Sequence, residues 1–445
     1  MKKLLVILIA VGLMLSVAAP AYADHGIGYE VQPGDTLYSI ARKFGVSPEA
    51  IIAENNLANP DQLTVDQWLF IPGATQPGPT LTATRKYVVQ RGDTLVKIAR
   101  KFGISVATII ADNHLTDSNL IRVGQRLTIV SPIPDWTTYN VENSGLGVVG
   151  GIAVDSQGRV WVATTRGLGM LAADRSLTVM TSANSGLADD NLYGGLAVDN
   201  QGRVWIGTRK GLSLLSPDGS WWTYTTANSG LALDEVNTVV VDVQGRVWAG
   251  TDSDILSMLA PNGSWTNYST GNESLGDHVW VQTLALDKQG RVWAGRVFIT
   301  ASEGNYILDG NTALSVGASD GKWTHYLPTD PSATGLVRDI AVDGKGRVWT
   351  ATGNGLIVFA PASGQWAIYT SANSDLTYGT VYTVAVDKQG RIWAGTDGGL
   401  SALNPDGSWT SFNLDETVWA LAIDERGRVW IGTDEGLSVF TPPAP

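Results

Sequence analysis

The sequence predicts a multidomain protein: two small βααβ modules of the α+β class, followed by an all-β, seven-bladed β-propeller that an N-terminal strand closes. Two internal repeats lead to this prediction. A motif of the form Asp-x-x-Gly-Arg-(Val/Ile)-Trp occurs seven times in the C-terminal part of the chain, and a longer unit occurs twice before it. The 445 residues are too many for one ordinary domain, and a hydrophobic content of 44% is enough for sizeable cores.

The seven motifs have the spacing of propeller blades. Their aspartates follow one another at intervals of 44, 43, 45, 56, 44 and 37 residues, and a period in the forties with several short strands is typical of a blade. Each Asp-x-x-Gly is expected to be a hairpin turn, in which the carboxylate accepts backbone N–H groups and the glycine adopts positive φ. A ring of metal-binding carboxylates is the alternative, and we predict no metal site. The aspartates are Asp155, Asp199, Asp242, Asp287, Asp343, Asp387 and Asp424.

The second repeat shows the four strands that each blade should contain. Strands a to d are expected at Gly195–Val198, Arg203–Gly207, Leu212–Ser216 and Trp221–Thr225. The segments between them are rich in Gly, Asp, Asn and Pro, which are turn-forming residues. Most d strands carry the pattern Trp-x-x-aromatic.

A strand of the d type precedes the first repeat. Trp136–Tyr139 has the Trp-x-x-aromatic pattern without a blade before it, whereas the last repeat stops after its c strand, Leu437–Phe440. We therefore expect the N-terminal strand to complete the last blade, so that no free edge remains between the first and last blades. The predicted propeller spans residues 135–441.

Composition and charge exclude several classes of function. The formal net charge is −12, without a basic cluster, which argues against nucleic acid or an anionic membrane as a partner. The chain has no cysteine, so disulfides, thiolate metal sites and cysteine nucleophiles are excluded. The four histidines are widely scattered. We predict no cofactor.

The N-terminus has the pattern of a signal peptide. Two lysines precede the apolar run Leu4–Val17, and small residues precede an expected cleavage before Asp24. The run is shorter than the ~20 residues that a membrane-spanning helix needs, although an uncleaved anchor is the alternative. We expect residues 1–23 to be removed and the mature protein to be secreted, extracellular or in the cell wall or periplasm, without membrane insertion.

Residues 29–72 and 87–130 are two copies of one unit, and residues 73–86, rich in Pro, Gly and Thr, are expected to link them. Each copy begins with a short strand that turns at Gly-Asp. A helix should follow, because apolar residues recur at i, i+3, i+4 and i+7. A second helix and a returning strand complete the βααβ order.

Both copies contain Tyr-x-Val-x-x-Gly-Asp-Thr-Leu-x-x-Ile-Ala and a later Asn-x-Leu. This pattern resembles the LysM family of glycan-binding modules. The resemblance implies recognition of glycans that contain N-acetylglucosamine, such as peptidoglycan or chitin, in a groove between the first strand–helix loop and the last helix–strand loop. By position it assigns to this groove Gly34, Asp35, Thr36, Leu37, Asn59, Asp61, Leu63, Gly92, Asp93, Thr94, Leu95, Asp117, Asn119 and Ile121.

The alternative is that the Gly, Asp, Thr and Leu of the motif serve only the turn and the core, above all at Leu37 and Leu95. The two copies also differ in charge. The first has six acidic and two basic side chains, and the second has three acidic and six basic ones. The first also has Asp66 where the second has Gly124. We therefore expect the second copy to bind an acidic wall more strongly, with a difference that salt weakens.

The blade repeats resemble the two-component-regulator propeller family, most closely over Asp155–Leu168, Asp199–Leu212 and Asp387–Leu400. In that family the repeats form ligand-sensing parts of membrane sensors, which implies a platform for a ligand or a protein partner. The repeats are also faintly similar to the streptogramin lyases, which need a histidine and a metal-binding acid. The propeller histidines are His278 and His325, and we predict no catalytic residue.

The blades differ on the face that carries the d–a loops. The residue five positions before each motif Asp is Gly150, Gly194, Asn237, Gln282, Arg338, Tyr382 or Trp419. The position before it is mostly valine, as expected for core between blades. We predict that Asn237, Gln282, Arg338, Tyr382 and Trp419 form a ring that binds a polar ligand at the channel mouth. The alternative is that these side chains merely plug the channel.

The same face carries an insertion and several acidic residues. Residues 296–313 of the fourth repeat are expected to form an inserted loop that acts as a wall or lid. Asp339, Asp415 and Glu416 are expected to be solvated loop charges. The sequence thus predicts an exported, wall-associated protein whose modules bind peptidoglycan or a chitin-like glycan and whose propeller binds an unknown ligand or partner. A propeller-based enzyme, either a lyase or a glycan hydrolase, is the alternative, and a structural spacer is a third.

Overall fold

The computed structural model describes most of the chain from residue 27 onward. The predicted signal peptide lies outside the described residues. The chain divides into two compact units, with the boundary between Thr80 and Leu81. Within the described parts of both units, every helix is too short or too polar to span a bilayer. The described residues are 27–31, 36–37, 40–41, 48–55, 57, 63–64, 67–71, 82–102, 104–115, 121–132, 136–140, 144–269, 279–302, 305–317, 323–328 and 335–442.

The first unit contains the first βααβ module. Strand β1 (Ile27–Glu30) pairs antiparallel with β2 (Trp68–Ile71), with Tyr29 opposite Leu69, and helix α2 (Pro48–Asn55) lies against β2. The apolar positions of the predicted first helix are buried with side chains of α2 and β2. This small core contains Val31, Leu37, Ile40, Ala41, Ile51, Leu69 and Ile71.

The second module is formed by β3 (Thr82–Val88), α3 (Leu95–Phe102), α4 (Val106–Asp112) and β4 (Arg126–Pro132). The Ser105 hydroxyl accepts the Thr108 N–H and so caps α4. The predicted order βααβ is therefore present, but β3 begins five residues before the expected start of the module. Residues 82–86 are strand rather than linker because they find backbone partners in β4 and in a propeller strand.

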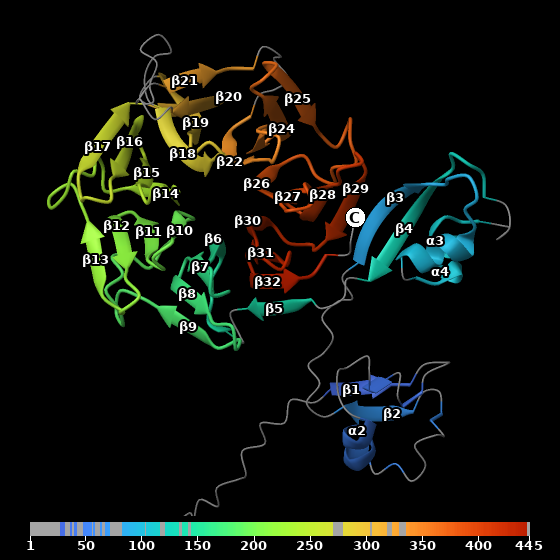
Figure 1. Ribbon diagram of the computed structural model, residues 1–445. Coiled ribbons are helices and arrows are strands. Elements are labelled where there is room, and N and C mark those ends of the chain that lie inside the picture. Colours follow the sequence, from blue (N-terminus) through green and yellow to red (C-terminus); the bar gives the residue numbers. More distant parts are fainter. Residues whose placement is uncertain are drawn as a thin grey trace, which may run out of the picture. The chain divides into compact units, whose positions relative to one another are not determined.

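The propeller is a ring of antiparallel sheets with four blade strands each, and in blades one to six these strands follow chain order from the ring axis outward (Figure 1). The sheet of blade six continues into β3 and β4, and blade seven takes its outer strand from before blade one. Blade one contains β6 (Val149–Val154), β7 (Val160–Thr164), β8 (Gly167–Leu171) and β9 (Leu177–Met180). Blade two contains β10 (Leu196–Val198), β11 (Val204–Thr208), β12 (Gly211–Leu215) and β13 (Trp221–Tyr224). Blade three contains β14 (Val236–Val241), β15 (Val247–Thr251), β16 (Ile255–Leu259) and β17 (Trp265–Ser269).

Blade four contains β18 (Val279–Leu286), β19 (Val292–Ser302), β20 (Asn305–Gly317) and β21 (Trp323–Tyr326). Blade five contains β22 (Val337–Val342), β23 (Val348–Thr352), β24 (Gly355–Ala360) and β25 (Gln365–Tyr369). Blade six contains β26 (Val381–Val386), β27 (Ile392–Thr396), β28 (Gly399–Leu403) and β29 (Trp409–Asn413). Blade seven contains β30 (Val418–Ile423), β31 (Val429–Thr433), β32 (Gly436–Phe440) and β5 (Thr137–Asn140). The seven-bladed propeller predicted from the repeats is thus the observed fold.

The outer strand of blade seven comes from the N-terminal side of the propeller. β5 pairs antiparallel with β32, with Tyr139 opposite Leu437. The Thr138 and Ser438 hydroxyls are 2.8 Å apart, and the Trp136 ring stacks on Phe440 with centroids 5.3 Å apart. Whether this strand holds the ring closed is a question of stability, and that role stays a prediction.

The Asp-x-x-Gly motif is a hairpin turn in all seven blades, as predicted. In blade one the Asp155 Oδ1 accepts the N–H groups of Gln157 and Arg159, at 2.9 Å each, and Gly158 has φ +76°. The structure adds a second set of bonds: Asp155 Oδ2 accepts the Arg159 Nε–H at 2.5 Å and the Trp161 indole N–H at 3.1 Å. The guanidinium also lies over the indole ring. The same set of bonds recurs in the other six motifs.

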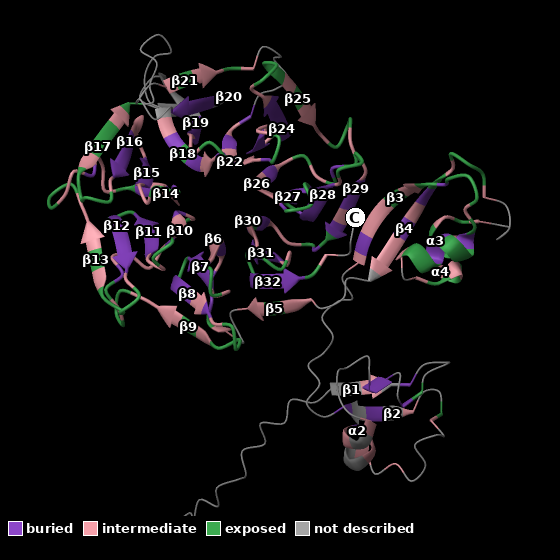
Figure 2. Ribbon diagram, in the orientation of Figure 1, coloured by how far each residue is buried: buried purple, intermediate pink, exposed green. Residues whose placement is uncertain are grey.

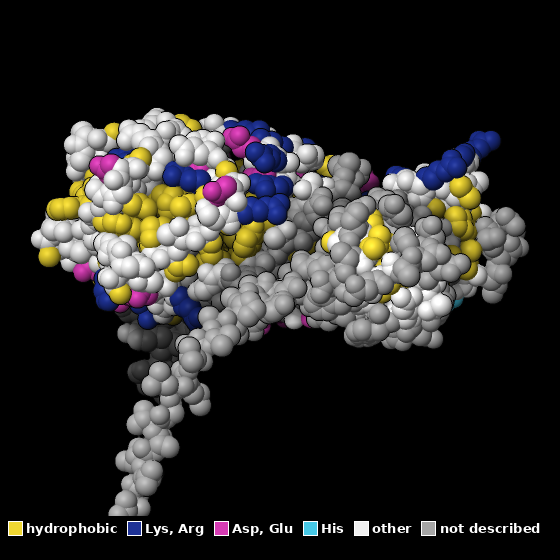
Figure 3. All heavy atoms as spheres, turned by 90° about the horizontal axis from the view of Figure 1, so that it is seen from below, with side chains coloured by type: hydrophobic (Ala, Val, Ile, Leu, Met, Phe, Trp, Pro, Cys, Tyr) yellow, Lys and Arg dark blue, Asp and Glu magenta, His cyan; other side chains and the backbone are white. Residues whose placement is uncertain are grey.

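Separate hydrophobic cores fill the spaces between adjacent blades. In one of them Trp349 and Val358 of blade five pack with Val384 of blade six. Figure 2 shows that burial is greatest in the b and c strands and falls toward the d strands, with β29 as an exception. A view turned by 90° shows hydrophobic side chains reaching the surface between charged ones (Figure 3), in keeping with the partial exposure of most d strands.

Residues 296–313 do not form the inserted loop that was expected. β19 and β20 of blade four extend to 11 and 13 residues, and they pair from Val292–Gly317 out to Ser302–Asn305. The insertion therefore continues the blade as a long hairpin, with a register shift between Arg296 and Phe298. Of the part of this hairpin that the structure describes, no residue lines the central cavity described below.

Deleting residues 136–139 should destabilise the propeller, because it exposes the backbone edge of β32 and the face of Phe440. The melting temperature should fall by several degrees, since each kcal/mol corresponds to about 2–4 °C in a large domain. Calorimetry and size-exclusion chromatography check this, with a chain lacking residues 443–445 as control. Unchanged melting and solution size would show that β5 does not close the ring.

The turn carboxylates predict how acid affects stability. Burial opposes ionisation, but hydrogen bonds from Trp161 and Arg159 outweigh it and hold the pKa of Asp155 below its ordinary value; Asp199, Asp343 and Asp424 shift in the same direction for the same reason. A carboxyl with a lowered folded-state pKa stabilises the fold above its unfolded pKa of about 3.9, and that stability is lost as the pH falls through the folded pKa. The melting temperature should thus stay level from neutral pH to about pH 5 and drop below about pH 4. A flat profile down to pH 3 contradicts this.

Candidate functional site

A cavity of about 570 Å³ lies where the innermost strands of the seven blades meet. Its lining includes all seven residues at the variable position five before the motif Asp: Gly150, Gly194, Asn237, Gln282, Arg338, Tyr382 and Trp419. The structure therefore brings the five predicted ring residues together around one cavity. The size is that of a small-molecule site, and the space between the side chains is open rather than plugged.

A β-bulge explains why this position faces the cavity. In six blades the register between the a and b strands shifts across the variable residue, as between Val337 and Asp339 on either side of Arg338. The same shift flanks Gly150, Asn237, Gln282, Tyr382 and Trp419. The extra residue of a bulge is left out of the ladder, and bulges re-aim side chains next to functional sites. The neighbouring Val337 stays in the inter-blade core. The bulge thus allows one residue to pack between blades while the next residue faces the cavity and differs from blade to blade.

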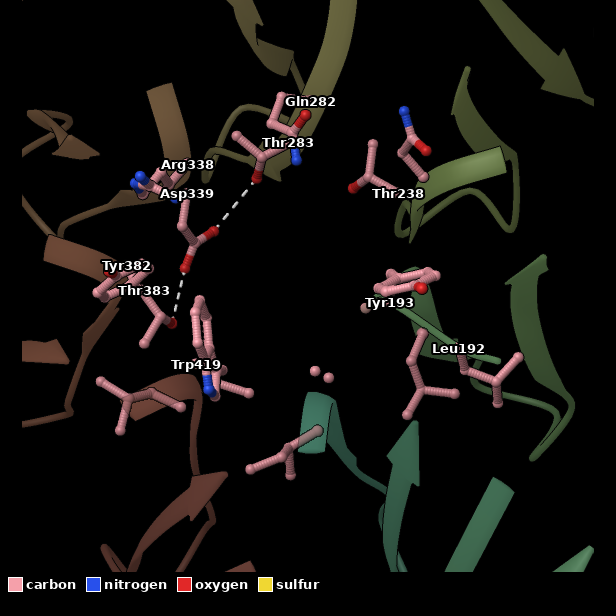
Figure 4. A pocket seen from close by; sticks show the side chains of 18 of the residues that line it. Leu192, Tyr193, Thr238, Gln282, Thr283, Arg338, Asp339, Tyr382, Thr383 and Trp419 are labelled. Carbon is pink, nitrogen blue, oxygen red and sulfur yellow. Dashed lines mark hydrogen bonds between the residues drawn. The ribbon is translucent and has the colours of Figure 1, made fainter. Parts of the chain in front are cut away.

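Three of the ring residues form a continuous row from blade five to blade seven. The Arg338 guanidinium lies 4.6 Å from the centroid of the Tyr382 ring, and the Tyr382 and Trp419 rings meet edge to face at 4.5 Å. The Trp419 indole N–H donates to Asp434 at 2.8 Å, which fixes the orientation of its ring. Figure 4 shows this row along one side of the cavity, with Gln282 next in order around the wall. Such a row offers a planar cation and two aromatic faces to a ligand.

The two amide residues of the ring are not equivalent. The Asn237 side-chain amide donates to Asp252, so its nitrogen is already engaged within blade three. Gln282 is exposed, and it points from β18 toward the cavity in Figure 4. Gln282 is therefore the amide best placed to donate to a ligand.

Asp339 is not the solvated loop charge that was expected. It lies on β22 beside Arg338, and its carboxylate spans three blades (Figure 4). Oδ1 accepts hydrogen bonds from the Thr283 hydroxyl at 3.2 Å and from the N–H of the next residue, Ile340, at 2.8 Å. Oδ2 accepts the Thr383 hydroxyl and the Val384 N–H, both at 2.9 Å. Burial raises the pKa of the Asp339 carboxyl, although these four hydrogen bonds oppose the rise.

Tyr193 is a cavity residue that sequence reasoning missed. It is 59% exposed and faces the row of Tyr382 and Trp419 from the opposite side (Figure 4). Arg209 lies 4.9 Å from its ring centroid, and Asn191 donates to its hydroxyl at 2.6 Å. The available signal was an interruption of the valine series, because Tyr193 stands where most other repeats have valine.

The two glycines of the variable position reflect close packing of blades one and two. A Cβ on Gly150 would lie 3.1 Å from the Tyr193 carbonyl oxygen, and one on Gly194, at φ +137°, would lie 2.9 Å from the Gly150 oxygen. Neither position can take a side chain unless the neighbouring backbone shifts. The variable position therefore contributes side chains to the cavity only in blades three to seven, whereas blades one and two line it with other residues such as Ile152 and Tyr193.

Among the remaining candidates for chemistry, Asp415, Glu416 and His325 are not residues of the cavity lining. Asp415 adopts φ +55° in the turn before β30, and burial raises the pKa of Glu416, near the acidic Glu435 and Asp434. His325 on β21 has its Nδ1 2.9 Å from the Ser315 hydroxyl, and burial lowers its pKa. His278 lies outside the described residues. Within the described residues, no three His, Asp or Glu side chains are arranged to hold a metal ion.

In the LysM-like loops, several motif residues serve the fold. Leu37 and Leu95 are 2% and 3% exposed and belong to the module cores, which favours the turn-and-core role for their side chains. Asp93 Oδ2 accepts the Tyr87 hydroxyl and the Gln90 N–H, both at 2.7 Å, while the Thr94 hydroxyl accepts the Lys97 N–H at 3.2 Å.

The other assigned loop residues are only partly within the described chain. Gly92 is exposed with φ +87°, and Thr36 is exposed in the corresponding loop of the first module. Leu63 and Ile121 are partly buried against their module cores. The following assigned residues lie outside the described residues: Gly34, Asp35, Asn59, Asp61, Asp117 and Asn119.

Family comparisons match both parts of the chain. The LysM domain model matches residues 29–72 and 87–130. The two component regulator propeller model matches residues 186–210, 375–398 and 414–435. The LysM matches have the same bounds as the two units found from the internal repeat.

Curated relatives match the LysM region. The secreted LysM effector ECP6 of Passalora fulva is 34% identical over 135 residues, which is 26% of this chain and 59% of that protein. The cell wall-binding protein YocH of Bacillus subtilis is 33% identical over 129 residues, 29% of this chain and 42% of that protein. The chitin elicitor-binding protein of Oryza sativa is 31% identical over 24% of this chain and 31% of its own length. The chain thus spans less than two thirds of each of these relatives.

Solved structures match the propeller. Virginiamycin B lyase from Staphylococcus aureus superposes with a TM-score of 0.55 at 13% identity, covering 69% of this chain and 99% of that one. The extracellular domain assigned to a hybrid two component system of B. thetaiotaomicron gives 0.56 at 19% identity, covering 72% and 43%. At these identities the likeness concerns the fold alone. The chain thus contains two LysM domains, at residues 29–72 and 87–130, and a seven-bladed β-propeller with repeats of the two-component-regulator type.

Proposed function

We propose that this protein is an exported, envelope-associated binding protein whose LysM domains hold N-acetylglucosamine-containing glycan and whose propeller binds a second, polar ligand in its central cavity. The observation that carries the glycan part is the pair of LysM domains. Relatives of this region are described as a cell wall-binding protein and a chitin elicitor-binding protein. Both peptidoglycan and chitin contain the sugar that the resemblance implies.

The cavity supports the second part of the proposal. Variable side chains are presented on a repeated scaffold, and the scaffold residues next to them are buried. The row of Arg338, Tyr382 and Trp419 offers a guanidinium and aromatic faces, and Gln282 offers an amide. Such groups suit a polar ligand with a flat or ring-shaped part, because they combine stacking with hydrogen bonds.

A chain beginning at Asp24 should be retained by insoluble peptidoglycan and by chitin. A chain beginning at Gly73, which lacks the first LysM domain, should keep most of its retention on peptidoglycan, because the second domain carries the basic side chains. Raised salt should weaken that retention, since the attraction between exposed charges is screened. A co-sedimentation assay measures this.

The control for sedimentation is a chain beginning at Trp136, which lacks both LysM domains but keeps β5. Circular dichroism establishes that each truncated chain is folded. If neither matrix retains the Asp24 chain above this control, the glycan part of the proposal is wrong. If the Gly73 chain alone loses all retention, the second domain is not the stronger binder.

Replacing Arg338 and Trp419 together with Ala should abolish binding of a cavity ligand and leave the fold intact, because both side chains lie at the cavity rather than in an inter-blade core. Candidate ligands are found by the thermal shift of the full chain with a panel of muramidase-released peptidoglycan fragments and short chitin oligosaccharides. The matched control replaces Trp222 and Arg426, which are exposed away from the cavity, with Ala. A ligand whose affinity ignores the cavity double change binds elsewhere, and conversion of a ligand would favour the enzyme alternative.

A further inference from the structure

The second LysM domain shares a sheet with blade six. β3 pairs antiparallel with β29, with Ala83, Thr84 and Arg85 opposite Phe412, Ser411 and Thr410. The resulting sheet has six strands, in the order β26, β27, β28, β29, β3 and β4. Its first strand carries Tyr382 of the cavity row, and its last two strands form the sheet of the LysM domain. Both parts belong to the compact unit that begins at Leu81.

Side-chain packing accompanies the backbone pairing. Ala83 is 1% exposed and belongs to one core with Trp393 and Phe412 of blade six and Phe440 of blade seven. The rings of Phe412 and Phe440 lie 5.1 Å apart, beside this alanine. The LysM strand therefore contributes to the inter-blade core rather than merely touching the rim.

Blade six differs from its sister blades where β3 covers it. Thr410, the residue after the d-strand Trp, is 3% exposed. Its counterpart in blade seven, Thr137, is half-buried, and those in blades one to five are exposed: Thr178, Trp222, Thr266, Thr324 and Ala367. The Arg391 side chain is 6% exposed, against 19–40% for the motif arginines of the other blades. In blade six, therefore, both the edge of the d strand and the motif arginine are more buried than in the blades that no further strand covers.

The sequence of β29, the d strand of blade six, suits a strand whose outer edge is covered by another strand. The aromatic residue that ends the d-strand pattern is Tyr in five blades: Tyr139, Tyr224, Tyr268, Tyr326 and Tyr369. In blade six it is Phe412, which lacks the hydroxyl and is 2% exposed. A buried tyrosine needs a hydrogen-bond partner for its hydroxyl, so phenylalanine is the residue suited to a d strand that another strand covers.

We propose that blade six is a docking edge for the second LysM domain, so that this domain and the propeller form one rigid body while the first LysM domain belongs to a separate unit. Strand addition satisfies the unpaired backbone groups of an edge strand, and Ala83 supplies the small apolar contact. The docking itself does not depend on the proposed function. If that function holds, a glycan bound by the second domain and a ligand in the cavity are held in a fixed mutual orientation.

A disulfide between β3 and β29 tests the docking directly, because the chain has no native cysteine. Thr84 and Ser411 are direct partners across the two strands, at a separation that suits a disulfide. Under mild oxidation the Thr84→Cys, Ser411→Cys chain should convert almost completely to an intramolecular disulfide, seen as a faster band on a non-reducing gel. The matched control pairs Thr84→Cys with Asn267→Cys, which occupies the position of Ser411 in the d strand of blade three. This pair should stay reduced.

Amide hydrogen exchange of β3 tests the pairing with β29 without a cross-link. The change Ala83→Glu places a charge in the shared core and should raise amide exchange of residues 83–85 at least tenfold, whereas Val88→Glu, at an exposed position of β3 beyond the pairing, should not. Cross-linking of both cysteine pairs, of neither, or between two chains would overturn the docking. So would equal exchange in the two glutamate variants. Loss of glycan retention alone would overturn the proposed function and leave the docking intact.

Discussion

The propeller depends on one repeated interaction, in which a buried aspartate joins a turn, an arginine and a tryptophan. One carboxylate oxygen closes the Asp-x-x-Gly turn, and the other accepts the Arg Nε–H and the indole N–H, as at Asp155. The indole is thereby held at a fixed angle within the core between neighbouring blades. Because a buried carboxylate is costly unless hydrogen-bonded, the motif must be complete, and this explains why Asp, Gly, Arg and Trp recur together seven times.

Each a strand is held in its blade by the repeated motif, so its cavity-facing residue can differ from one blade to the next. The a strand has a bulge at its second residue, as at Arg338; this residue faces the cavity, while the valine before it stays in the core. We therefore expect a change at Arg338, Tyr382 or Trp419 to alter the cavity without disturbing the blades. The link between Asp339, Thr283 and Thr383 then ties three a strands together beneath the row.

Edges are the second constraint on such a ring. A blade without a d strand would expose the backbone edge of its c strand, and a d strand has a free outer edge of its own. Blade seven takes its d strand from residues 137–140, which precede the first blade in the chain. Blade six has its own d strand, and β3 of the second LysM domain covers it. The second LysM domain is thus part of the same hydrogen-bonded sheet as β26, which carries a residue of the cavity row.

The sequence by itself determined the blade number, the strand order, the two LysM domains and the ring of variable residues, because each follows from local periodicity repeated along the chain. Only the tertiary structure decided that β3 pairs with β29, that Asp339 spans three blades and that Tyr193 faces Trp419. These contacts join residues far apart in the chain, for which no local pattern exists. The insertion at 296–313 shows the same limit: the longer interval between motifs marked a departure from the repeat, but only the pairing between β19 and β20 showed that it is a hairpin.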